Sequence, residues 1–145
     1  VLSAPGGPRL SAALDRLDFM VSVDLYVNET TRHADVILPG LSPLEDSHYD
    51  VAFPQLSCRN QARYSAALFA PPAGHPPEWQ TLLRLLAVVT GRGARADVVA
   101  LDDEWLADDV RRLASDQAPA VLAAVGGFRG PERWLDLALR SGPRA

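Results

Sequence analysis

The sequence predicts an α/β fold: a partial Rossmann-like parallel sheet with flanking helices, followed by a small helical element. Two hydrophobic runs, Phe19 to Val23 and Val36 to Leu38, indicate strands. Neither run alternates between apolar and polar residues, which is typical of strands covered on both faces. Because only a short polar crossover joins them, we expect neighbouring parallel strands. Beyond residue 77 the apolar residues follow the helical period instead.

Composition narrows the class of protein. The 145 residues are enough for one hydrophobic core, and 48% apolar with 22% charged residues is ordinary for a globular chain. The net charge of −4 argues against a nucleic-acid-binding surface, which needs a basic patch. No apolar run approaches the ~20 residues of a membrane span. The single cysteine, Cys58, excludes an internal disulfide and a cysteine-based metal cluster within this chain.

Residue 1 is Val rather than Met, so we expect the chain to be an internal piece of a longer protein. No signal peptide is visible, and we expect the parent protein to be cytoplasmic. The chain begins with a Gly/Pro-rich loop, residues 1–8. A helix from Arg9 to Leu17 is predicted next, with one apolar stripe that packs on the sheet, formed by Leu10, Ala13, Leu14 and Leu17.

The crossover between the strands is polar. Asn28 is expected to cap a helix of one or two turns, with Glu29 in its first turn. His33 follows, and we expect it on the surface because no Cys or second His stands at metal-ligand spacing. Asp35 then opens the second strand, and Pro39 ends it because proline cannot donate to a strand ladder.

Asp24 closes the first strand and is the candidate that matters most. Ligands of open α/β sheets bind beyond the carboxyl ends of the strands, where Asp24 and Gly40 lie. Two interpretations are open. The structural one is a carboxylate that accepts backbone N–H bonds from the following turn. The functional one is a carboxylate that accepts the N1–H and the exocyclic amine of a guanine, a planar two-point pairing.

The second half of the chain is helical in pattern. A helix is predicted from Glu78 to Thr90, where Gly91 stops it, and another from an N-cap at Asp102 or Asp103 to about Ser115. A last helix starts at Gly130. The G-x-G-x-x-A pattern after Thr90 follows a helix rather than a strand, so we do not interpret it as a nucleotide-binding loop.

The first half of the chain also contains a set of residues that is typical of a known protein family. Its residues are Asp24 at a strand end, the pair Glu29-Thr30, the run Ala34 to Pro39, and Glu45. This pattern resembles the molybdopterin oxidoreductases of the dimethyl sulfoxide reductase class, which includes formate dehydrogenases and nitrate reductases. The N-terminal VLSAPGGPRL resembles the continuation of the family's Gly-Asn-Pro loop. The resemblance covers residues 1–65, and no motif extends it beyond residue 92.

The resemblance implies a set of cofactor-binding residues and no catalytic residue or metal ligand. It implies that residues 1–65 are part of the domain that binds one molybdopterin guanine dinucleotide. Asp24 would recognise the guanine, and Val23 would contact it alongside. The N–H of Gly40 would face a phosphate or ribose, and the hydroxyl of Ser3 would contact the cofactor. Residues 66–77 would then be a proline-rich connector and residues 78–145 a helical segment.

The resemblance further implies two-electron redox chemistry at molybdenum or tungsten in the full-length enzyme. Electrons would pass to an iron–sulfur cluster that, like the metal ligand, lies elsewhere in the parent chain. The expected partners are the remaining domains of that enzyme and an electron-transfer partner that the sequence does not identify. We expect this fragment alone to be inactive.

Two other classes stay open. The first is a non-catalytic α/β binding or interaction module, in which Asp24 is structural and the helical tail is a docking surface. The second is a hydrolase that uses Glu45 and Asp50. It ranks last because such carboxylates need a cleft that separates their pKa values, and nothing in the sequence specifies one.

Overall fold

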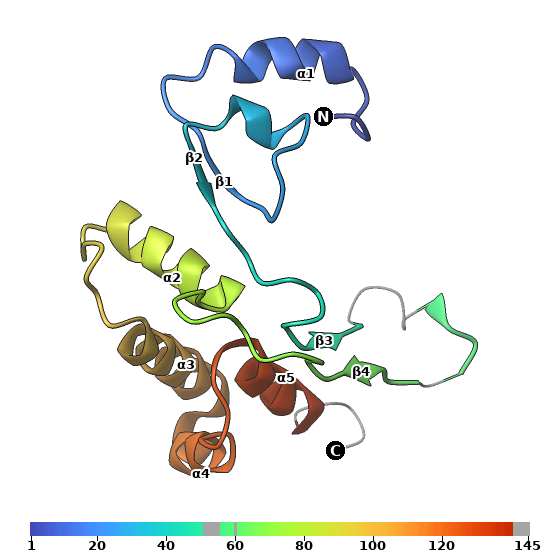
Figure 1. Ribbon diagram of the computed structural model, residues 1–145. Helices are drawn as coiled ribbons and strands as arrows, with labels where there is room; N and C mark the ends of the chain where they lie inside the picture. Colours follow the sequence, from blue (N-terminus) through green and yellow to red (C-terminus); the bar gives the residue numbers. More distant parts are fainter. Residues whose placement is uncertain (51–55, 60, 141–145) are drawn as a thin grey trace. The chain divides into compact units, whose positions relative to one another are not determined.

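The computed structural model describes residues 1–50, 56–59 and 61–140 of the chain (Figure 1). The chain divides into two units, Val1–Pro77 and Glu78–Ala145. Unit 1 mixes helix and strand, and it contains α1 (Gly7–Leu14), β1 (Val21–Val23), the 3-10 turn η1 (Thr31–His33), β2 (Val36–Leu38), β3 (His48–Tyr49) and β4 (Tyr64–Ser65). Unit 2 contains α2 (Glu78–Val89), α3 (Val98–Ala114), the 3-10 turn η3 (Ser115–Gln117), α4 (Ala118–Ala124) and α5 (Gly130–Arg140).

A small parallel sheet forms the part of unit 1 that positions the candidate site. β1 and β2 pair in parallel, with Val21 opposite Val36 and Val23 opposite Leu38. The pair is fixed at its start by Asp35, whose carboxylate accepts the backbone N–H of Met20 at 2.7 Å. The predicted parallel neighbours are therefore confirmed. A larger Rossmann-like sheet is not seen in the described residues, where this sheet has two strands.

The two strands are not covered on both faces, which corrects the sequence-based expectation. Val21 is 38% exposed and Val36 is 40% exposed. The reason is that α1, the one α-helix among the described residues of unit 1, buries none of its own residues. This helix begins at Gly7, earlier than predicted, because Pro8 suits a first helical turn. It ends at Leu14, so Leu17 of the predicted stripe lies outside it and is exposed.

A second strand pair follows in unit 1. β3 and β4 are antiparallel, with His48 opposite Ser65. The carbonyl of Leu44 accepts the N–H groups of Leu68 and Phe69 at 2.8 and 2.9 Å, which holds the chain after β4 beside the turn before β3. Residues 66–77 contain neither helix nor strand, as expected from a proline-rich sequence.

Unit 2 is a helical assembly with the main hydrophobic core of the described chain. Its central buried cluster consists of Leu106, Val110, Ala118 and Val125. Trp134 and Leu137 of α5 pack against that cluster. The helix predicted from Glu78 is confirmed as α2, and Gly91 follows it with a left-handed φ of 80°.

The N-cap predicted for α3 is wrong. Asp97 caps this helix, and its carboxylate accepts the N–H groups of Val99 and Ala100 at 3.0 and 3.2 Å. Asp102 and Asp103 lie inside the helix instead. The adjacent valines do not prevent helix formation, because Val98 is buried and gains packing that outweighs a weak helix propensity.

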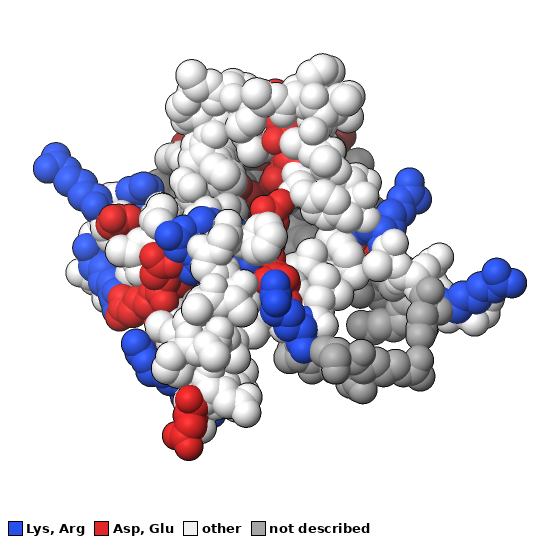
Figure 2. Space-filling view, turned by 90° about the horizontal axis from the view of Figure 1, so that it is seen from below, with Lys and Arg blue, Asp and Glu red and all other residues white. Residues whose placement is uncertain are grey.

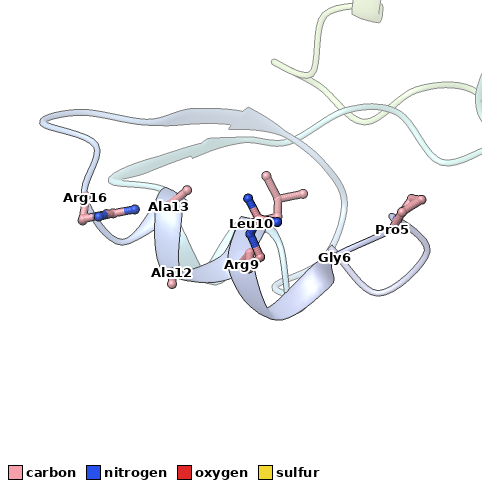
Figure 3. Close-up of a pocket in the computed structure, with 7 residues that line it drawn as sticks. All are labelled: Pro5, Gly6, Arg9, Leu10, Ala12, Ala13 and Arg16. Carbon is pink, nitrogen blue, oxygen red and sulfur yellow. The ribbon is translucent and has the colours of Figure 1, made fainter.

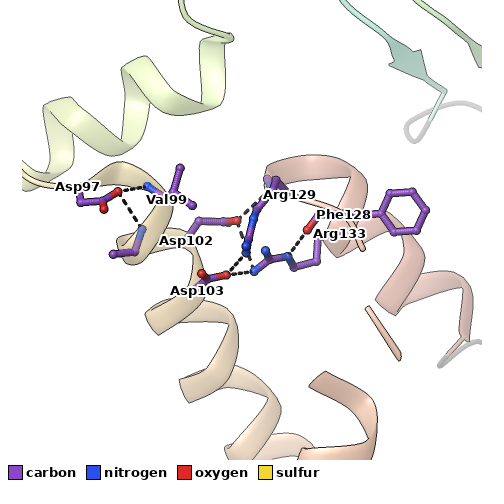
Figure 4. A network of polar contacts seen from close by, with 9 residues as sticks. Asp97, Val99, Asp102, Asp103, Phe128, Arg129 and Arg133 are labelled. Atoms are coloured by element: carbon purple, nitrogen blue, oxygen red, sulfur yellow. Dashed lines mark hydrogen bonds and ion pairs between the residues drawn. The ribbon is translucent and has the colours of Figure 1, made fainter. Parts of the chain in front are cut away.

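Asp102 and Asp103 connect α3 to the start of α5 through a buried arginine (Figure 4). Arg133 is 2% exposed, and its Nη1 lies 2.6 Å from Asp103 and 3.5 Å from Asp102. Its Nε donates to the carbonyl of Phe128 at 2.7 Å. The buried Asp102 also accepts the backbone N–H of Gly130 at 3.0 Å. Nη2 of Arg133 is buried and finds no hydrogen-bond partner among the residues that the structure describes.

Gly130 makes a close contact within unit 2. It has a φ of 55°, and a Cβ at this position would lie 2.7 Å from the indole ring of Trp79. Glycine is therefore required at the start of α5 both by the backbone and by the packing against α2.

Figure 2 shows basic and acidic side chains interspersed over the face that it draws, without a single basic patch there. Within the described residues, no helix has both the length and the apolar character needed to cross a bilayer.

Candidate functional site

Three of the four predicted cofactor-binding residues lie together at the carboxyl edge of β1 and β2. Val23 ends β1, and the N–H of Asp24 continues the ladder by donating to the carbonyl of Leu38 at 3.2 Å. Gly40 lies beside Val23, since a Cβ added to Gly40 would be 4.0 Å from the Val23 Cγ1 atom. The parallel register thus brings together residues that are distant in the sequence.

Ser3 lies in the N-terminal turn and is exposed. That turn is held against the crossover, because the amino group of Val1 donates to the hydroxyl of Thr30 at 2.8 Å. The side chain of Ser3 has no hydrogen-bond partner within the described part of the chain. The structure thus does not join Ser3 to Asp24 directly.

The carboxylate of Asp24 accepts three hydrogen bonds from the turn that follows it. Its Oδ1 accepts the backbone N–H of Leu25 at 2.7 Å and that of Tyr26 at 3.2 Å. Its Oδ2 accepts the side-chain amide of Asn28 at 2.8 Å. A carboxylate offers about four acceptor positions, so one position, on Oδ2, is left.

These bonds keep Asp24 charged. The N–H of Tyr26 and the amide of Asn28 lower the pKa of the Asp24 carboxyl, and the N–H of Leu25 adds to the effect. Their combined influence exceeds the opposing effect of desolvation, which raises the pKa. An aspartate is charged at neutral pH even at its ordinary pKa, and these donors make the charged form still more favourable.

The crossover that supplies these donors is closed by hydrogen bonds of its own. Oδ1 of Asn28 accepts the N–H groups of Thr30 and Thr31 at 2.9 and 3.1 Å. The predicted cap is nevertheless corrected, because η1 begins at Thr31 with Thr30 at its N-cap position. Asn28 therefore holds the turn before the helix, and Glu29 lies outside the helix. The hydroxyl of Thr31 accepts the N–H of Asn28 at 2.8 Å and donates to the carbonyl of Tyr26 at 2.9 Å. Thr31 is 1% exposed, so this hydroxyl forms the buried centre of the turn.

His33 was expected on the surface, and that expectation is wrong, because its side chain is 5% exposed. Its Nδ1 lies 2.7 Å from Asp15, and its Nε2 lies 3.0 Å from the hydroxyl of Ser11. A histidine that contacts a serine through one ring nitrogen and an aspartate through the other also occurs in the catalytic triad of hydrolases. Here Ser11 lies within α1, and the contact serves to tie this helix to η1.

A groove of about 570 Å³ runs along α1 (Figure 3). It is lined by Pro5, Gly6, Arg9, Leu10, Ala12, Ala13 and Arg16. The lining includes none of the predicted cofactor-binding residues and does not include Ser11. The groove therefore does not coincide with the carboxyl edge of the sheet.

The carboxylates proposed for a hydrolase are engaged separately. Glu45 accepts the backbone N–H of Ser42 at 3.0 Å, which closes its own turn. Asp50 pairs with His48 at 3.0 Å in an exposed contact. No group of three His, Cys, Asp or Glu side chains within the described residues is placed to hold a metal ion.

The chain was then compared with known proteins. It is 49% identical over 45 residues to the assimilatory nitrate reductase catalytic subunit of Bacillus subtilis (strain 168). The match covers 31% of this chain and 6% of that relative. No protein-family model matches the chain, and no solved structure matches it. The similarity therefore supports a relationship to molybdopterin oxidoreductases over a short segment.

Sequence reasoning missed two features of this region. The first is the donor that Asn28 gives to Asp24, although the spacing of four residues across a strand end is compatible with such a turn. The second is the burial of the His33 side chain, which depends on Ser11 of α1 and on Asp15 just after α1, 22 and 18 residues away in the sequence. No local pattern could reveal that second contact.

Proposed function

We propose that this chain is part of a molybdopterin-dependent oxidoreductase, from the domain that binds one molybdopterin guanine dinucleotide. The observation that carries the proposal is a charged Asp24 at the carboxyl edge of a parallel strand pair, in a chain with a segment 49% identical to a nitrate reductase catalytic subunit. When bound, such a cofactor supplies two-electron redox chemistry at its metal. The activity, the substrate and the electron partner belong to the whole enzyme.

In this proposal, the guanine end of such a cofactor binds at this edge. Guanine presents two parallel N–H donors, and a carboxylate is the acceptor that pairs with both. Oδ2 of Asp24 has one acceptor position left, while Oδ1 already accepts two N–H groups. A two-point contact would therefore share or displace the longer of these bonds, that from Tyr26 at 3.2 Å. Gly40, which lies beside Val23, would add its backbone N–H nearby.

The other proposed ligand contacts have less support. Val23 offers its backbone and a van der Waals surface beside Gly40. Ser3 enters the proposal through the resemblance of the N-terminal loop alone. We assign none of the described residues a catalytic role, and the isolated chain is expected to be inactive.

A non-catalytic module is the second candidate, and one observation favours it. The hydrogen bonds that Asp24 accepts from Leu25 and Tyr26 are the pattern of a structural strand-end carboxylate. In that case Asp24 stabilises the turn and binds no ligand. Nucleotide binding distinguishes the two candidates.

The test is titration calorimetry of the full chain with GMP, with AMP as the reference nucleotide. Affinity for GMP should be weak, about millimolar or roughly 4 kcal/mol, because a dinucleotide site normally draws on further domains. The matched variant is Asp24→Asn, which keeps an oxygen for Leu25 and Tyr26 but loses the charge. Binding that prefers GMP over AMP and disappears in the variant supports a guanine site at Asp24. If Asp24→Asn binds GMP as well as the wild type does, Asp24 does not contact the guanine.

A further inference from the structure

Asn28 acts in two directions at once, which distinguishes it from an ordinary helix cap. Its Oδ1 accepts two backbone N–H groups from Thr30 and Thr31, and its Nδ2 donates to Asp24 at 2.8 Å. The two backbone donors fix the orientation of the amide, because a flipped amide would point its own NH2 group at them. The donor end must therefore face Asp24.

The backbone beneath Asn28 is held as firmly as its side chain. The N–H of Asn28 donates to the buried hydroxyl of Thr31, which in turn donates to the carbonyl of Tyr26. Tyr26 is also the residue whose N–H reaches Asp24. The turn thus forms a closed loop of hydrogen bonds, and the Asn28 amide is the side-chain donor that it presents to the carboxylate.

These hydrogen bonds fix the plane of the Asp24 carboxylate. With Leu25 and Tyr26 on Oδ1 and Asn28 on Oδ2, rotation of the carboxyl group about its Cβ–Cγ bond would break bonds at both oxygens. A planar two-point contact needs the plane of the acceptor to match the plane of the base. The hydrogen bond from Asn28 would therefore help to align the Asp24 carboxylate with the plane of a bound guanine.

We propose, on the basis of the function proposed above, that Asn28 is a positioning residue that sets the orientation of Asp24 for guanine recognition. It contacts Asp24 and is not itself assigned a contact with the ligand. Its contribution is specificity, so a change at Asn28 should weaken discrimination between bases as well as overall affinity.

The test uses the full chain, with GMP and with IMP, which lacks the exocyclic amine of guanine. Asn28→Asp is the informative variant, because it keeps an oxygen for Thr30 and Thr31 but places a second carboxylate against Asp24. At pH 7 it should bind GMP at least about tenfold more weakly and lose most of the preference for GMP over IMP. When the pH is lowered towards 5, the introduced carboxyl group takes up a proton and donates to Asp24 as the amide does. GMP affinity should then recover.

The control is Asn28→Ser, whose hydroxyl still caps the crossover but is too short to reach Asp24. It should weaken GMP binding without recovery at acid pH. If Asn28→Asp binds GMP like the wild type, with the same preference and pH profile, the inference is overturned while the proposed function stands. If the wild type shows no GMP binding, the proposed function fails and this inference fails with it.

Discussion

At the scale of single residues, Asp24 shows how the hydrogen bonds of a turn can stabilise the charged form of a carboxylate. Three donors from the next four residues hold its carboxylate, and they lower its pKa. The same bonds stabilise the folded chain, since they are stronger to a carboxylate than to a carboxylic acid. The lowered pKa and the stability of the fold are thus linked at this residue.

This linkage predicts a pH dependence of folding. Because the folded pKa of Asp24 lies below the ordinary value of 3.8, the unfolded chain binds more protons in that range, and stability falls as the pH falls. The free energy of unfolding of the wild type relative to Asp24→Asn should be constant from pH 7 to about pH 5. It should shrink below 3.8. Urea unfolding at a series of pH values measures it, and a difference that is independent of pH would contradict the assignment.

At the scale of elements, one buried ion pair joins α3 to α5. Arg133 is 2% exposed and reaches both Asp102 and Asp103, of which Asp102 is the buried one. Burying two charges has a desolvation cost that offsets much of their attraction. An arrangement of the two helices that separated the buried charges would have a higher free energy still, so the pair favours the observed docking of α3 and α5.

We therefore predict strong coupling between Arg133 and Asp102. Arg133→Met leaves a buried carboxylate without its cation and should lower the free energy of unfolding by about 3 kcal/mol. In an Asp102→Asn background, which keeps an acceptor for the N–H of Gly130, the same substitution should cost about half as much. Chemical unfolding of the four proteins of this double-mutant cycle measures the coupling, and equal costs in both backgrounds would refute it.

The sequence predicted local elements well wherever local chemistry decides them. The turn at Asn28 and the stop at Gly91 follow from residues within a few positions of each other. The parallel strand pair follows from two hydrophobic runs that are joined by a short polar crossover. The predicted cap of α3 was misplaced because several aspartates stand close together in the sequence, and it is Asp97 that accepts the first N–H groups of the helix. The neighbours of His33 depend on tertiary contacts that periodicity does not encode.

The candidate site was predictable in its position but not in its detail. Asp24 and Gly40 could be assigned to one edge of the sheet, because parallel strands place their carboxyl ends together. The hydrogen bonds that orient Asp24 depend on the path of the crossover, which the sequence leaves open. Ser3 stays a prediction, since no contact within the described residues joins it to the others.

At the scale of the whole molecule, burial is distributed unequally. All of the fully buried hydrophobic side chains of the described chain lie in unit 2, among them Leu106, Val110 and Val125, whereas unit 1 buries Thr31. Hydrophobic burial is the main source of folding free energy. Unit 2 should therefore be the more stable part.

This inequality can be measured by hydrogen exchange. Amides of α3 should exchange at least roughly tenfold more slowly than those of β1 and β2, because strands with half-exposed side chains open at lower free energy. Mass spectrometry of the exchanging full chain resolves the two regions. Equal protection would mean that the strand pair is stabilised by something other than the burial described here.

The contact between Gly130 and Trp79 also constrains how this protein can change over time. The indole ring occupies the space that any larger residue at position 130 would need, and the left-handed backbone there already disfavours a side chain. The two positions therefore cannot drift independently. A lineage that replaces Gly130 must first reduce the ring at position 79, whereas a smaller residue at position 79 leaves Gly130 in place, so the order of the two changes is fixed.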